Sequence, residues 1–214
     1  MDAIYTEEYK GHKIEIIPDD GDFSPSEWGD DGAFLVHYHR DCWIEGPKRN
    51  GRHIITEDDL RAWYQGQSKA NPHILRKELA KDYYIFAVSA YIHSGVSLSL
   101  ESTFPMDSYG WDTSHVGAVL VSKKEGTKAE ARKIALGVVN TWNDYLSGNV
   151  YGYVIDKDGD SCYGFYGDYE EGALAEARSA LDYIVKENRK KNEEKLKTYI
   201  TNNVPLEKRK LIKE

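Results

Sequence analysis

The stretch from Asp82 to Ile92 constrains the fold of this chain more than any other part of the sequence. Its residues are almost all apolar or aromatic, with one serine inside the run. Such a run is typical of a central strand that is buried on both faces of a sheet. It is far too short to cross a bilayer, which takes about 20 apolar residues. We therefore expect a core built around an internal β-strand and no membrane association.

Further strand and helix patterns surround this run. Helix signals begin at Thr56, Asn71, Thr127 and Asp168, and Thr127 with Glu130 forms a capping box. We expect an α+β fold with a mostly antiparallel sheet of about six or seven strands. Three or four helices are expected, mainly on one face, the last of them a long C-terminal helix. The other predicted strands lie at residues 13–17, 33–39, 96–100, 116–121, 150–155 and 161–166.

Charge divides the chain into two parts. Residues 186–214 carry ten Lys or Arg and five Asp or Glu, whereas residues 1–185 carry 18 basic and 31 acidic residues. We expect one globular α+β domain over residues 1–185 and a basic, helical extension over residues 186–214. An acidic body argues against a nucleic-acid binder and suits a basic protein partner. Weak binding of nucleic acid stays open only for the basic residues from Lys186 to Lys213.

The two cysteines and the N-terminus predict the compartment. Cys42 and Cys162 are the only cysteines, and the chain starts with a polar, acidic segment rather than a signal peptide. We therefore expect reduced thiols and a cytoplasmic location. The chain contains no P-loop, zincin, kinase or nucleophile-elbow signature, so no cofactor is expected.

Two segments contain residues of the types that bind metals. Five Asp and one Glu lie between Pro18 and Asp31, without the spacing of an EF-hand, and predict a solvated acidic loop. Asp30 and Asp31 in this loop are candidate residues for binding a basic partner. His37 and His39 share one strand face, but two histidines need at least one further ligand, such as Cys42. We therefore predict no metal site.

Tyrosine-rich strands near residues 150 and 163 predict a partner surface. Tyr151, Tyr153 and Tyr163 lie in a hairpin whose strands also contain Gly152 and Gly164, so the rings can cover bare backbone. Tyrosine is common at interfaces because it combines a large apolar ring with a polar tip. These three tyrosines are the candidate binding residues.

Three polar residues could form a hydrolase site. Cys162, His93 and Asp112 suit the roles of nucleophile, base and orienting acid. Each also has an ordinary structural interpretation: Cys162 as a small buried side chain, His93 as a turn residue and Asp112 as a turn cap. The absence of a local catalytic signature favours a protein that is not an enzyme.

Five segments of this chain resemble a family of uncharacterised small proteins of phages and prophages. The likeness includes a "HSG…WDSGQVG" core, matched here by residues 93–95 and 111–117, and a "YLRGEVYGY" block, matched by residues 145–153. This chain departs from the pattern at residues 113–115 and at Tyr163, where the family has tryptophan, so Ser114 and His115 are poor candidates for a shared catalytic role. The remaining matches lie at residues 9–11, 24–40 and 161–167.

The resemblance implies a phage accessory gene and supplies no activity or catalytic residue. Such proteins commonly bind a host protein, often a nucleic-acid enzyme of a defence or replication system. We therefore expect a host-directed binding protein, such as an inhibitor of the anti-CRISPR or anti-restriction type. An acidic, tyrosine-rich surface would compete for a basic groove. The alternatives are the Cys162–His93–Asp112 hydrolase and weak nucleic-acid binding by the basic tail.

Overall fold

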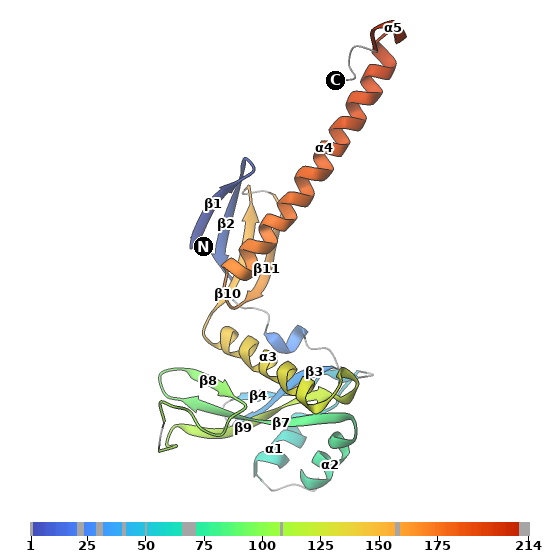
Figure 1. The fold of residues 1–214 in the computed structure, drawn as a ribbon. Coiled ribbons are helices and arrows are strands. Elements are labelled where there is room, and N and C mark those ends of the chain that lie inside the picture. Colours follow the sequence, from blue (N-terminus) through green and yellow to red (C-terminus); the bar gives the residue numbers. More distant parts are fainter. Residues whose placement is uncertain are drawn as a thin grey trace. The chain divides into compact units, whose positions relative to one another are not determined.

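The chain forms an α+β structure with two separate antiparallel sheets (Figure 1). The computed structural model describes residues 2–20, 24–28, 32–39, 42–49, 51–65, 72–107, 109–156 and 159–209. Residues Met1–Pro18 with Tyr151–Glu214 form one compact unit, and Asp19–Val150 form the other. The expectation of one domain over residues 1–185 stays a prediction, and contacts within that range cluster into these two units.

A five-stranded sheet is the centre of the unit Asp19–Val150. Its strand order is β4-β3-β9-β7-β8, and all its neighbours are antiparallel. The run from Asp82 becomes β7, an internal strand as predicted, whereas β8 lies at an edge. The strands are β3 (Ala33–His39), β4 (Cys42–Ile44), β7 (Tyr83–Ile92), β8 (Val96–Ser99) and β9 (Thr113–Ser122).

Helices cover both faces of this sheet, so the expectation of helices mainly on one face is wrong. α3 (Lys128–Leu146) packs Ala135, Val139 and Trp142 on one face. α1 (Glu57–Gln65) packs Leu60 on the other face, and Leu79 of α2 (Pro72–Asp82) joins the same cluster. A sheet with two apolar faces requires this arrangement, since either face left bare would expose its side chains to water.

Local signals explain the ends of α3. The predicted capping box is confirmed, because Thr127 Oγ1 accepts from the Glu130 N–H and the Glu130 carboxylate accepts from the Thr127 N–H at 2.8 Å. Gly148, with φ of 74°, follows the helix. Four short elements complete this unit: the ribbon strands β5 (Lys48–Arg49) and β6 (Arg52–His53), and the 3-10 turns η1 (Pro25–Trp28) and η2 (Lys123–Glu125).

Gly117 allows β9 and β3 to approach closely. A Cβ at Gly117 would lie 2.2 Å from the carbonyl oxygen of Val36. The neighbour at this position is the backbone of β3, so only glycine fits here without a shift of the strands.

The other unit contains a four-stranded sheet in the order β1-β2-β10-β11. Its two halves come from opposite ends of the chain, since Ile16 of β2 pairs with Tyr153 of β10. The expected single sheet of six or seven strands is therefore corrected to two larger sheets and a two-stranded ribbon, with more strands in total. The strands of this unit are β1 (Tyr5–Tyr9), β2 (His12–Pro18), β10 (Val150–Ile155) and β11 (Ser161–Tyr166).

The predicted long C-terminal helix is confirmed as α4 (Ala175–Asn203). A π-helical turn, η3 (Glu170–Leu174), leads into it, and α5 (Leu206–Arg209) follows. Ala177 and Leu181 pack in the core of this unit, and Arg178 holds Glu7 of β1 with two hydrogen bonds of 2.8 and 2.6 Å. Arg178 thereby lowers the pKa of the Glu7 carboxyl.

Among the described residues, no helix combines the length and the apolar character that crossing a bilayer requires.

Candidate functional site

Two of the three predicted catalytic residues lie together at one end of the five-stranded sheet. His93 follows β7 and Asp112 precedes β9, and the His93 Nδ1 lies 3.5 Å from the Asp112 Oδ2. The Ile92 N–H donates to the Asp112 carbonyl oxygen at 2.9 Å, which holds the two segments side by side. The side chains of His93 and Asp112 are 67% and 44% exposed, so water surrounds the pair.

Cys162 lies in β11, in the other unit. Its thiol is exposed, and the Sγ–H donates weakly to the Tyr163 carbonyl oxygen at 3.8 Å. The structure therefore defines no geometry that joins Cys162 to His93 and Asp112, and the three-residue hydrolase site stays a prediction.

The loop formed by residues 104–107 and 109–112, here called the aromatic loop, is organised by one carboxylate. Asp107 Oδ1 accepts from the Trp111 N–H at 3.0 Å. Asp107 Oδ2 accepts from the Asp112 N–H at 2.9 Å and from the Thr113 hydroxyl at 2.7 Å. The hydroxyl of Thr113, followed by these backbone N–H groups, lowers the pKa of the Asp107 carboxyl. The ionised form of Asp107 is therefore the form that holds the loop.

The aromatic loop directs three large apolar side chains into water. Met106 is 65% exposed, and Tyr109 and Trp111 are each 88% exposed. The two rings lie next to each other, with centroids 6.4 Å apart. Phe104 at the start of the loop is buried instead, and its ring lies next to that of Tyr91, with the two centroids 5.9 Å apart. The loop is thus anchored by one aromatic ring and presents two others.

No residue between Phe104 and Trp111 was predicted from the sequence to contribute to a site. A local signal was present. Asp107 precedes Gly110 and Thr113 at the short spacings at which a carboxylate can bond following backbone groups. Gly110 has φ of 68°, a conformation that favours glycine, and its N–H donates to the Asp107 carbonyl oxygen at 3.1 Å.

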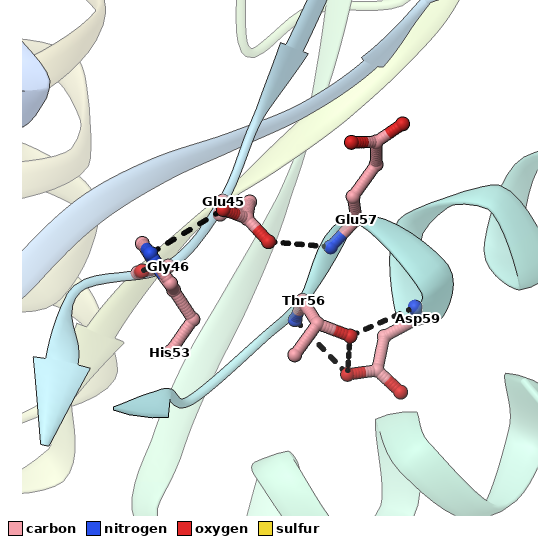
Figure 2. A network of polar contacts seen from close by, with 6 residues as sticks. All are labelled: Glu45, Gly46, His53, Thr56, Glu57 and Asp59. Carbon is pink, nitrogen blue, oxygen red and sulfur yellow. Dashed lines mark hydrogen bonds and ion pairs between the residues drawn. The ribbon is translucent and has the colours of Figure 1, made fainter. Parts of the chain in front are cut away.

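A second carboxylate, that of Glu45, joins three segments after β4 (Figure 2). Glu45 Oε1 accepts from the Glu57 N–H at the start of α1 at 2.7 Å. Glu45 Oε2 lies 3.3 Å from His53 Nε2, while His53 Nδ1 donates to the Gly46 carbonyl oxygen at 2.5 Å. Both ring nitrogens are engaged, so His53 ties the β5–β6 ribbon in place and is not poised as a base.

The start of α1 has its own cap beside this network. The Thr56 hydroxyl donates to Asp59 Oδ2 at 2.8 Å, and the Asp59 N–H donates back to the Thr56 hydroxyl at 3.3 Å (Figure 2). The cap formed by Thr56 and Asp59 does not supply an acceptor for the Glu57 N–H. Glu45 supplies that acceptor.

The predicted binding tyrosines differ in exposure. Tyr153 is 4% exposed and packs on Phe165, and Tyr151 packs on Tyr169. Tyr163 is 46% exposed and its ring covers Gly152, where a Cβ would lie 2.3 Å from the ring, as the glycine pattern predicted. Their binding role stays a prediction. Asp30 and Asp31 lie outside the described residues.

The residues considered as metal ligands do not form a described site. His37 is buried in β3, and the side chains of His39 and Cys42 lie outside the described part. Within the described residues, no group of three or more His, Cys, Asp or Glu side chains could hold a metal ion.

The basic residues from Lys186 to Lys213 lie mainly along the exposed second half of α4. Up to Arg209 their described side chains are exposed or only partly covered. Residues 210–214 lie outside the described residues, and nucleic-acid binding by this segment stays a prediction.

Comparison with protein-family models, with curated proteins and with solved structures finds no match for this chain.

Proposed function

We propose that this protein acts by binding a partner protein through the aromatic loop. The observation that carries the proposal is the exposure of Tyr109 and Trp111, each 88%, beside the Trp111 and Asp112 N–H groups that donate to Asp107. Burying a large apolar side chain is worth about 1.5–3 kcal/mol, and the exposed rings of Tyr109 and Trp111 do not gain this stabilisation on folding. A partner that buries the two rings would supply it.

The composition of the loop suits an interface. Tryptophan, tyrosine and methionine are enriched at protein interfaces, and tryptophan and tyrosine dominate binding hot spots. A preformed loop also loses little conformational entropy on binding, which favours affinity. Met106, Tyr109 and Trp111 together therefore make a compact anchor for a partner surface.

The charge around the loop points to a basic partner. Residues 93–115 contain Glu101, Asp107 and Asp112 and no Lys or Arg. Arg132 of α3 pairs with Glu101, so Asp107 and Asp112 are the carboxylates of this segment that no Lys or Arg of the described residues neutralises. The acidic excess of residues 1–185 acts in the same direction over longer range. Charge complementarity of this kind speeds association and selects basic surfaces.

The partner class follows from the resemblance to phage accessory proteins. A host enzyme that handles nucleic acid carries a basic groove for phosphates, and an acidic ligand can occupy it. We therefore extend the proposal to inhibition of a host defence or replication enzyme in the host cytoplasm. The aromatic loop would supply the apolar contacts, and the acidic residues would attract the basic partner electrostatically.

The test is affinity capture from bacterial lysate with matched tyrosine variants. Tyr109→Ala should reduce the yield of the specific partner strongly, whereas Tyr183→Ala, which removes a ring that is 67% exposed on α4, should not. Equal capture by wild-type protein and Tyr109→Ala would refute the role of the loop. Binding to the isolated partner that does not weaken with added salt would refute the electrostatic part.

A further inference from the structure

We propose that a groove beside α3, here called the α3 groove, binds a nucleotide: a nucleobase carrying a phosphate. The groove consists of two adjoining hollows of ≈ 300 and ≈ 670 Å³ in the unit Asp19–Val150. Both hollows are lined by Ser26, Glu45, Pro47 and Trp142. The volume suits one small ligand, since binding sites commonly measure about 300–1,000 Å³.

Trp142 offers an unused hydrogen-bond donor in this groove. The ring is 6% exposed, and no described residue accepts a hydrogen bond from its indole N–H. No described side-chain nitrogen or oxygen is both sealed from water and without a partner, so the indole N–H keeps some access to solvent, and the Trp142 ring lines the groove. A buried donor of this kind favours a ligand with an acceptor atom.

Glu45 offers the complementary acceptor. Its carboxylate lines both hollows and is fixed by the Glu57 N–H and by His53 (Figure 2). Each carboxylate oxygen can accept more than one hydrogen bond, so acceptor capacity remains for a ligand. A ligand in the groove therefore meets a donor and an acceptor together, as the edge of a nucleobase requires.

The larger hollow adds aromatic surface and positive charge. Trp43 and Tyr145 line it, and base–aromatic contacts are a common means of holding nucleotides. The Arg61 guanidinium lies over the Trp43 ring, 4.8 Å from its centroid, so within the described part of the chain Tyr145 is the ring without a stacked cation. Lys48 lies in the lining of this hollow without an ion-pair partner among the described residues. This cation favours a phosphate and disfavours a cationic ligand, although the body as a whole is acidic.

The Trp142 donor and the Glu45 acceptor together favour some nucleobases over others. Guanine presents two neighbouring N–H donors, which match a carboxylate, and a carbonyl oxygen that can accept from an indole N–H. We therefore expect guanine nucleotides to bind in preference to uridine nucleotides. The same chemistry could come from a free nucleotide or from single-stranded RNA, and the experiment below separates the two.

The experiment follows the Trp142 indole N–H signal by NMR in the full-length protein, with the signal assigned through Trp142→Phe. GMP or a five-nucleotide guanosine-rich RNA should shift this signal in a saturable way. Guanosine, ribose 5-phosphate and UMP should each bind more weakly than GMP. Lys48→Ala should weaken binding roughly fivefold, the size of one exposed charge contact.

Lys128→Ala, at the exposed start of α3, is the matched control and should leave the affinity unchanged. Saturable binding of GMP identifies a free nucleotide, and binding of the RNA alone identifies a single strand. The proposal is overturned if neither ligand shifts the indole signal at millimolar concentration. It is equally overturned if ribose 5-phosphate binds as well as GMP, or if Lys48→Ala and Lys128→Ala behave alike.

Discussion

The aromatic loop and the α3 groove are both organised by one carboxylate, but they direct their aromatic rings differently. Asp107 collects N–H groups of its own loop and leaves Tyr109 and Trp111 in water. Glu45 collects groups from distant segments and faces a groove lined by Trp142. Rings held outward suit the flat surface of a protein, whereas a concave site suits a small ligand.

The hydrogen bonds of Asp107 and Glu45 also differ in the sequence separation that they span. Asp107 bonds residues at most six positions away, so the loop can keep its conformation largely by itself. Glu45 bonds Glu57 twelve positions away, and Trp142 reaches the groove from another helix. The groove therefore depends on the packing of the whole unit, while the loop depends on it less.

The largest effect is expected from Gly117→Ala, which should disrupt the packing on which the groove depends and affect the loop less. The added Cβ would lie 2.2 Å from the Val36 carbonyl oxygen, so β3 and β9 must separate. We expect a loss of about 3 kcal/mol or more in the free energy of unfolding. Chemical denaturation measures it. Gly137→Ala, in open space on α3, is the control and should stabilise by about 0.5–1 kcal/mol.

Asp107→Ala should damage the loop and spare the groove. Without the carboxylate, the Trp111 and Asp112 N–H groups lose their acceptor and the rings lose their fixed position. We expect partner affinity to fall roughly tenfold with little change in Tm, since ordering the loop must then occur on binding. An unchanged affinity in a calorimetric titration would show that the fixed loop conformation is irrelevant to binding.

Glu45→Ala should damage the groove and spare the loop. The Glu57 N–H and His53 each lose a partner, so we expect a loss of about 1 kcal/mol in the free energy of unfolding. Hydrogen exchange should show faster opening at the start of α1 and in the β5–β6 ribbon. Glu78→Ala serves as the control, because Glu78 pairs only with Lys81 on the exposed surface of α2.

Acid should loosen the loop by protonating Asp107. The pKa of Asp107 is lowered in the folded protein, so its stabilising effect is complete above the ordinary value of 3.8 and is lost as the pH falls through the lower folded value. Fluorescence of Trp111, measured against a Trp111→Phe variant, should change below about pH 4 in the wild type. In Asp107→Asn this transition should be missing.

The smallest effect is expected from His93→Ala. The side chain of His93 is 67% exposed, which predicts a Tm change below about 2 °C, as for most surface substitutions. A larger loss in thermal unfolding would mean that the His93–Asp112 pair stabilises the end of the sheet.

The predicted and observed strands show which elements the sequence patterns could locate. The patterns placed β3, β10 and β11 at their observed bounds and found the capping box of α3. They missed β1 and the short strands β4, β5 and β6, whose apolar patterns are too brief to stand out. They also could not show that Asn143 of α3 bonds both backbone groups of Leu98 in β8, at 2.7 and 3.0 Å, and so covers that sheet edge.

The candidate sites likewise differ in how much of each the sequence predicted. His93 and Asp112 were expected to matter and do lie together, since both flank strands that pair directly. The α3 groove had no signature in the chain, because its residues come from segments about a hundred positions apart. Cys162 was predicted as a third member of a site because it lies in a motif-like segment. Contact clustering assigns it to the other unit, and its role in such a site stays a prediction.

Local chemistry was enough to define the long C-terminal helix, the internal strand β7 and the capped helix α3, since caps, turns and apolar periods act over a few residues. Tertiary structure alone decided that the chain builds two sheets. Pairing of β2 with β10 joins residues more than 130 positions apart, and no local pattern records such a pairing. It likewise decided that Tyr109 and Trp111 face water while Trp142 lines a groove, because exposure depends on what packs nearby.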